Sequence, residues 1–173
     1  TFSVTNLKTG ANEIRSLWPE PIYGQDASDL EYRFNWNAPF FVSIYDTKTI
    51  YLAGNVVFKS TDQGMSWTPI SKDLTSDHPE KQVIAGSGWL PEYFGQEIYS
   101  TIHRMVESRI ERGVIWAGSD DGLIHVTRDA GKTWRDVSIP DLPKYSQIYE
   151  IDASPHDAAT AYVVIKNYNT NDD

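Results

Sequence analysis

Two stretches of this chain share one eight-residue motif, and this repetition constrains the fold more than any other feature. The first motif is Ser60-Thr61-Asp62-Gln63-Gly64-Met65-Ser66-Trp67, and the second is Thr127-Arg128-Asp129-Ala130-Gly131-Lys132-Thr133-Trp134. Such residues suit a tight hairpin, because Asp accepts hydrogen bonds from turn N–H groups, Gly adopts positive φ and Trp covers the apolar side. We therefore predict a structural role for the shared positions, which are Ser60, Asp62, Gly64 and Trp67 in the first motif and Thr127, Asp129, Gly131 and Trp134 in the second.

A second repeated pattern extends the unit beyond the motifs. In three places a Ser lies three residues before an acidic residue and eight before an aromatic residue, and these places begin at Ser43, Ser108 and Ser154. The step from Ser108 to Ser154 is about 46 residues, close to the length of a four-stranded propeller blade. The step from Ser43 to Ser108 is about 20 residues longer, which indicates an insertion between the first two units.

The composition suits an all-β fold and excludes several classes of function. Aromatic residues make up 13% of the chain, and Gly and Pro lie mainly between short apolar runs, as in strands joined by turns. A net charge of −9 argues against sequence-independent binding to nucleic acid, which needs a basic surface. No run approaches the roughly 20 apolar residues of a membrane span. The chain has no Cys, and its four His show no metal-ligand spacing, so we expect neither a metal site nor a cofactor.

The repeats predict two four-stranded antiparallel blades and the start of a third. The expected strands cover about 38–43, 49–54, 56–61 and 66–71 in the first unit, 99–107, 113–118, 123–128 and 133–138 in the second, and 148–153 and 160–168 in the third. The chain then divides into five segments. Residues 1–30 form an outer strand of a preceding blade with a loop, and residues 31–71 form the first blade. An insertion (72–98), the second blade (99–138) and a linker with the start of the third blade (139–173) follow.

An arc of this kind cannot close into a ring, because propellers use about four to eight blades. The predicted fold class is therefore all-β, an incomplete β-propeller, and we interpret the chain as a piece of a larger polypeptide. Open strand edges and apolar blade faces are unfavourable in water. We expect the remainder of a larger propeller, or another protein subunit, to cover the open edge.

The motif is the one called the Asp-box, and the chain resembles sialidase-like and sortilin-like (VPS10-like) β-propellers. More specifically, it resembles large bacterial proteins labelled glycosyl hydrolase, BNR-repeat or sortilin N-terminal-domain. The resemblance rests on the two motifs and on the runs 32–39 and 115–124, and it covers about residues 30–168. It implies a bacterial protein outside the cytoplasm, periplasmic or secreted. One departure is Ala130, which stands where a second Gly is common.

Blade topology predicts where a ligand would bind. The motif hairpins join third to fourth strands and lie on one rim, whereas the connections between blades lie on the other rim, where propellers usually bind ligands. We expect the ligand-binding candidates there: Arg33, Asn35, Trp36, Trp89, Tyr93, Glu97, Tyr99 and Asp120. Aromatic side chains beside carboxylates suit sugar or peptide recognition. The structural alternatives are packing between blades for Arg33 and Trp36, turn formation for Asp120, and a solvated loop acid for Glu97.

The leading functional hypothesis is a non-catalytic binding and scaffolding propeller that recognises a protein, peptide or glycan. The alternative is part of a glycoside hydrolase, sialidase-like or xyloglucanase-like. Glycosidases hold two carboxylates about 5–10 Å apart, and the candidate acids Glu92 and Glu97 both lie on the predicted insertion. A third hypothesis, again from resemblance, is an assembly factor similar to the propellers that aid photosystem II biogenesis.

Overall fold

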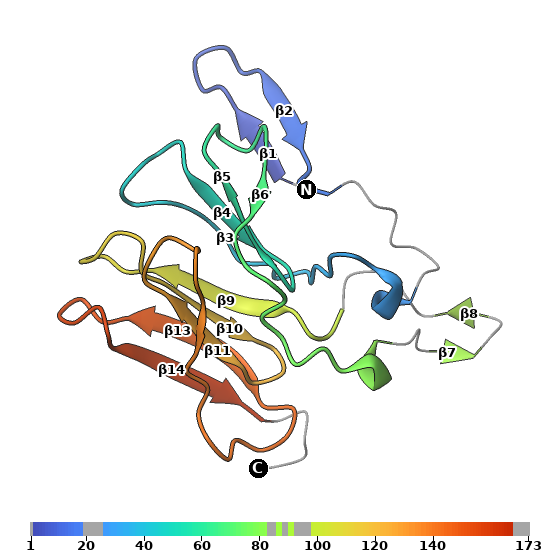
Figure 1. Cartoon of the computed structure of the whole chain (residues 1–173). Helices are drawn as coiled ribbons and strands as arrows, with labels where there is room; N and C mark the ends of the chain where they lie inside the picture. The colour runs from blue at the N-terminus through green and yellow to red at the C-terminus, as the bar shows by residue number, and fades with distance from the viewer. Residues whose placement is uncertain (1, 19–25, 83–85, 88–89, 92–97, 168–173) are drawn as a thin grey trace.

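The chain folds into antiparallel sheets that follow one another in sequence order (Figure 1). A computed structural model describes residues 2–18, 26–82, 86–87, 90–91 and 98–167. The only helical elements in these ranges are two single 3-10 turns, η1 (Ala27–Asp29) and η2 (Pro79–Lys81). No helix of the described residues is long and apolar enough to cross a membrane.

Two sheets have four strands each, in the order in which the chain forms them. The first blade contains β3 (Phe40–Val42), β4 (Ile50–Ala53), β5 (Val57–Ser60) and β6 (Thr68–Pro69). The second blade contains β9 (Ile102–Glu107), β10 (Ile115–Ser119), β11 (Ile124–Thr127) and β12 (Arg135–Asp136). A third, partial blade pairs β13 (Gln147–Ala153) with β14 (Ala161–Lys166). The fold is thus an incomplete β-propeller with two full blades and part of a third, which confirms the predicted fold class.

The N-terminal region differs from its prediction. The sequence predicts one outer strand within residues 1–30, but β1 (Phe2–Thr5) turns back and pairs with a second strand, β2 (Asn12–Arg15). The turn forms because the Asn6 side chain accepts hydrogen bonds from the N–H groups of Lys8 and Thr9, and because Gly10 has φ +74°. A further short hairpin, β7 (Gly86–Ser87) with β8 (Leu90–Pro91), lies in the predicted insertion.

The two motifs form equivalent hairpins between the third and fourth strands of their blades. Asp62 accepts hydrogen bonds from the N–H groups of Met65 and Ser66 and from two hydroxyls, and Asp129 accepts equivalent bonds around Thr133. The bond from the Thr133 hydroxyl is the main reason that the pKa of Asp129 falls to about 2. Ser66 is bonded to Asp62 and lies outside the sheet, and β6 is shorter than the strand predicted over 66–71.

Main-chain conformation explains the Gly in each motif and the departure at Ala130. Gly64 and Gly131 have φ +85° and +94°, and the residues before them, Gln63 and Ala130, have φ +62° and +60°. Two successive residues of each turn are therefore left-handed, a conformation that glycine adopts most readily. A Gly at position 130 would fit this conformation well, and Ala130 adopts it at some cost.

The Ser positions of the second repeated pattern are also equivalent. Ser43, Ser108 and Ser154 are buried, and their N–H groups donate to the carbonyl oxygens of Thr49, Val114 and Thr160. Each hydroxyl accepts a hydrogen bond from the N–H group two residues later. This equivalence aligns the blades residue by residue, so that Phe40 in β3 corresponds to Met105 in β9.

Apolar side chains fill the spaces between neighbouring blades. One cluster joins Tyr51, Ala53, Val57 and Leu74 of the first blade and its linker to Ile102, Met105, Ile115 and Ala117 of the second. Another joins the second blade to β13 and β14 through residues that include Trp116, Val126, Ile148 and Ile151. The consecutive blades therefore stack face to face, with their first strands β3, β9 and β13 at the inner end.

Candidate binding site

The segment after the first blade lies on the rim opposite the motif hairpins, as far as the structure describes it. Leu74 N–H donates to the carbonyl oxygen of Asn55, in the turn between β4 and β5. Ser76 N–H donates to Asp121, in the turn between β10 and β11, at 2.8 Å. These turns join second to third strands, so they lie at the end of each blade away from the motifs. Residues 72–82 are therefore on the predicted rim.

Arg33 forms the framework of this rim. Its guanidinium contacts Asp73 at 2.6 Å and Asp77 at 3.1 Å, and its Nε donates to the carbonyl oxygen of Ser100 at 3.2 Å. Asn55 supports the cluster, because its Nδ2 also donates to Asp73. Arg33 thus joins the segments before β3, after β6 and before β9, and its buried side chain already has partners. Its predicted ligand contact remains a prediction.

Asp120 occupies the place in the second blade that Asn55 has in the first. Its Oδ1 and Oδ2 accept hydrogen bonds from Thr101 N–H at 2.9 Å and from the Thr101 hydroxyl at 3.0 Å. Asp120 is 6% exposed, and burial raises its pKa to about 7. The neighbouring Asp121 is also buried, accepts from Ser119 and Ser76, and has a pKa raised by burial. Both carboxyl groups are directed into hydrogen bonds within the rim.

Tyr99 belongs to an aromatic group on the same rim. Its ring lies 6.3 Å from His78 and 6.3 Å from Tyr145, measured between ring centroids. The Tyr99 hydroxyl is buried without a hydrogen-bond partner among the described residues, and burial raises its pKa. Lys81 and Lys144 lie over the Tyr145 ring, at 4.6 and 5.1 Å from its centroid. The rim therefore presents two cations around one ring.

The other predicted ligand residues are more scattered. Asn35 donates from Nδ2 to the carbonyl oxygen of Ile98 at 2.9 Å, and Trp36 is 65% exposed beside it. Both line a smaller pocket on the face of the first blade that points away from the second, near Trp18 and Phe34. Trp89, Tyr93 and Glu97 lie outside the described residues. The structure thus brings Arg33, Tyr99 and Asp120 to one rim and places Trp36 on a separate surface.

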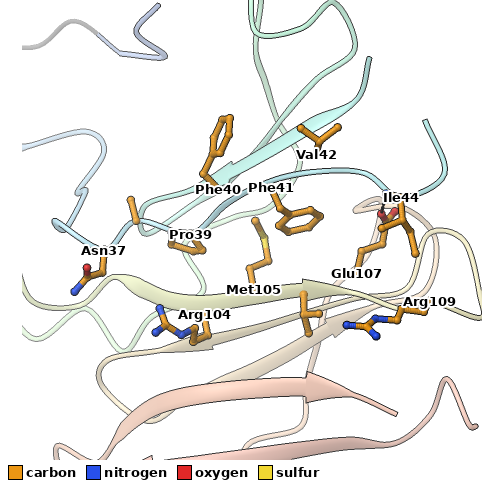
Figure 2. A pocket seen from close by; sticks show the side chains of 12 residues that line it. Asn37, Pro39, Phe40, Phe41, Val42, Ile44, Arg104, Met105, Glu107 and Arg109 are labelled. Carbon is orange, nitrogen blue, oxygen red and sulfur yellow. Dashed lines mark hydrogen bonds between the residues drawn. The ribbon is translucent and has the colours of Figure 1, made fainter. Parts of the chain in front are cut away.

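A groove between the first strands of the two blades was not predicted. This inner groove, of about 480 Å³, lies between β3 and β9 and is lined by 12 residues, 10 of which are labelled in Figure 2. Figure 2 shows Phe41 and Met105 pointing toward each other between the strands, whereas Phe40 and Val42 point to the opposite side of β3. The space between the blades therefore has apolar walls where it opens toward the inner end.

Charged residues are distributed along the β9 side of the inner groove. Glu107 is buried and accepts hydrogen bonds from the Ser43 hydroxyl at 2.8 Å and from Ile44 N–H at 3.1 Å, which fixes β9 against the end of β3. Arg104 pairs with Glu150 at 3.1 Å. Arg109 is exposed, and no ion pair of its side chain occurs within the described residues. The groove consequently has one unpaired cation at its end.

Sequence reasoning missed Met105, Glu107 and Arg109 as site residues. The strand that contains Met105 and Glu107 was predicted, but nothing in its composition separated a groove wall from an ordinary strand. The alignment of Ser43 with Ser108 contained part of the missing signal, because it makes Met105 the equivalent of Phe40 and so puts both on the same face of their blades. The contact between Met105 and Phe41 depends on how the two blades stack, which the repeat does not specify.

Comparisons with known proteins bear on the fold alone. No protein-family model and no curated protein matches this sequence. Among solved structures, an ancestral GH74 enzyme is similar over 76% of this chain and 17% of its own, with 15% identity and a TM-score of 0.48. YCF48 from Cyanidioschyzon merolae is similar over 76% of this chain and 51% of its own, with 16% identity and a TM-score of 0.21. This chain thus spans a minor part of the first structure and about half of the second.

Proposed function

We propose that this chain is part of a non-catalytic binding propeller, and that its inner groove recognises an extended peptide segment of a partner protein. The observation that carries the proposal is the combination, in one groove, of apolar walls, two strand edges and an unpaired cation. β3 and β9 are each the first strand of their sheet and pair on one side only. An extended peptide can bind such an edge through its main chain and place alternate side chains in a groove.

Charge complementarity defines the peptide more closely. Phe41 and Met105 suit aliphatic side chains, whereas Arg109 suits a carboxylate. The chain as a whole has a net charge of −9, so an exposed Arg beside the apolar walls gives this groove a local charge opposite in sign to that of the chain. The expected ligand is therefore a peptide in which an Asp or Glu lies beside Leu, Ile or Val.

The arrangement of acids favours binding over glycoside hydrolysis. A glycosidase needs two carboxyl groups that reach the scissile bond. Among the acids of the described rim, Asp73 and Asp77 are paired with Arg33, and Asp120 and Asp121 are buried and accept hydrogen bonds from Thr101, Ser119 and Ser76. They stabilise the rim in this arrangement and leave no open acid pair between them.

We also propose that further blades of a larger propeller cover the two open faces of the arc. Phe40 is 44% exposed, whereas its counterpart Met105, which faces the first blade, is 8% exposed. At the other end, Tyr162 and Val164 of β14 are exposed in alternate positions. Both faces thus expose apolar side chains at positions whose equivalents in other blades are buried.

The peptide proposal is tested with an array of immobilised peptides that combine one Asp or Glu with Leu, Ile and Val. Hits are then measured in solution by fluorescence polarisation. Arg109→Ala should weaken binding about fivefold, the effect of losing one partly exposed charge pair. The control is Arg135→Ala, because Arg135 is also exposed but lies on the outer strand β12. Equal affinity of the Arg109 and Arg135 variants, or binding that prefers Lys-containing peptides, would overturn the proposal.

A further inference from the structure

Matched hydrogen bonds show that Phe58 and His125 occupy the same place in their blades. Val57 N–H donates to the Ser71 hydroxyl in the first blade, and Ile124 N–H donates to the Ser138 hydroxyl in the second. The residue after each donor is Phe58 in β5 and His125 in β11. Both precede the motif hairpin by the same number of residues, so the two positions can be compared directly.

The space beside Phe58 is filled by aromatic rings of the chain itself. Tyr32 packs edge-on against Phe58 with a centroid distance of 4.9 Å, and Phe34 lies 6.1 Å away in a stacked arrangement. Phe58 is consequently buried. The first blade therefore shows that a six-membered ring fits against a residue at this position.

The equivalent space beside His125 is open. An outer groove of about 630 Å³ lies there between the two blades. One wall comes from the end of the first blade, residues 69–74, and the other comes from His125, Asp136 and the second motif, including Trp134. Both walls belong to complete blades within the described residues, so the groove does not arise from an uncovered end of the arc.

Polar groups distinguish the outer groove from its filled counterpart. Lys72, Lys132, Thr133 and Asp136 are exposed at the groove, and Trp134 adds a partly buried indole. Neither Lys makes an ion pair within the described residues. Burial lowers the pKa of His125 and so favours the neutral imidazole, which can both donate and accept hydrogen bonds. An all-carbon ring would displace water from Lys132 and Asp136 without replacing its hydrogen bonds, whereas a ring that carries hydroxyls would pair with them.

We propose that the outer groove binds a sugar ring of a glycan, in the place that Tyr32 takes against Phe58 in the first blade. The Trp134 indole offers an apolar surface to the C–H face of the sugar, as aromatic side chains do in carbohydrate recognition. Asp136, Thr133 and Lys132 lie where they can bind its hydroxyls. The site is separate from the inner groove, since it lies between outer strands, and it therefore goes beyond the proposed peptide recognition.

The repeat supplies the variants that test this site. His125→Phe introduces the residue that the first blade tolerates at this position, so it should preserve the fold while removing the polar partner and reducing the space. The probes are glucose, galactose, xylose, N-acetylglucosamine and glucuronate, added singly. Binding is followed by the shift of the Trp134 indole N–H in NMR spectra, with the other five Trp as internal references.

At least one sugar should shift the Trp134 signal, and His125→Phe should weaken its binding at least tenfold. Lys132→Met, which copies Met65 of the first motif, should weaken binding about threefold, because it removes one partner of the sugar hydroxyls. The control is His156→Phe, because His156 is exposed on the loop between β13 and β14. A panel in which no sugar moves the Trp134 signal would overturn the proposal, as would unchanged binding by His125→Phe. Arg109→Ala should leave sugar binding unchanged, which separates this test from that of the peptide groove.

Discussion

The indole of Trp134 joins the second blade to the first, since its Nε1 donates a 2.7 Å hydrogen bond to the carbonyl oxygen of Ile70. Gly131 permits the approach, because a Cβ there would lie 2.6 Å from the Ile70 side chain. In the first motif Gly64 meets Phe2 in the same manner, but Nε1 of Trp67 is buried without a partner among the described residues. Each motif hairpin is thus shaped to receive the end of a preceding sheet, and the first receives β1 incompletely.

The two Trp residues should therefore differ in their contribution to stability. Trp134→Phe removes a hydrogen bond and leaves the Ile70 carbonyl without its donor, so it should lower the free energy of unfolding by about 1–2 kcal/mol beyond the loss of packing. Trp67→Phe removes an indole N–H that already has no partner and should cost less. Urea denaturation of both variants measures the difference. Equal losses would show that the contact with Ile70 contributes nothing to stability.

Local features of the fold were predictable from the sequence. The motif hairpins depend on bonds between residues at most four positions apart, such as those from Ser66 to Asp62. The three Ser turns likewise depend on donors two or three residues away. Short-range geometry of this kind is fixed by residue type and spacing, so the blades and the rim on which residues 72–82 lie could be derived from the repeat.

Long-range contacts of the candidate sites could not be derived in this way. The partners of the Arg33 side chain lie 40 to 67 residues away in the chain, and nothing in the sequence pairs them. The inner groove depends on how far Phe41 and Met105 approach when the blades stack. The β1–β2 hairpin was not predicted, because the turn residues Asn6 and Gly10 indicate a hairpin only if a strand is also predicted after them. The segment 12–15 is short and polar, so its sequence does not predict a strand.

Arg33 should be important for stability, whatever ligand the rim binds. Replacement by Met removes the contacts with Asp73, Asp77 and the Ser100 carbonyl, and it leaves those acceptors partly buried. We expect a loss of about 2–3 kcal/mol, somewhat less than for a fully buried ion pair because both Asp side chains retain solvent contact. The matched control is Arg104→Met, which breaks the more exposed pair with Glu150 and should cost about 0–1 kcal/mol. Chemical denaturation that ranks the two variants in the reverse order would contradict this role.

Because of Asp120, the chain should become less stable as the pH rises above the pKa of an ordinary carboxyl group. Its pKa of about 7 in the folded state lies above the value near 3.9 of an unfolded chain. Between these values the folded state binds the proton more tightly, so stability is fully present at low pH and falls until about pH 7. The loss between pH 5 and 8 is on the order of 2 kcal/mol.

Asp120→Asn should flatten this dependence, since the amide has no proton to lose and its oxygen can still accept from Thr101 N–H. Urea denaturation at pH 5 and pH 8 measures the effect as the difference between variant and wild type, which removes the contributions of other titrating groups. Asp152→Asn is the control, because Asp152 is exposed on β13. A variant that loses as much stability as the wild type between these pH values would show that Asp120 titrates normally.

The two open blade faces should make the isolated chain associate. Phe40 and Val42 on β3 and Tyr162 and Val164 on β14 expose apolar surface that water disfavours, and β14 has an unpaired edge in the described structure. Sedimentation velocity should therefore show average mass that rises with concentration. Val42→Lys combined with Val164→Lys should reduce association without lowering the melting temperature, because both side chains are exposed and a charge on each face opposes pairing. Thr68→Lys, on the exposed outer strand β6, serves as the control and should leave association unchanged. A wild-type chain that stays monomeric and melts cooperatively would mean that its faces need no cover, and the proposed further blades would have to be abandoned.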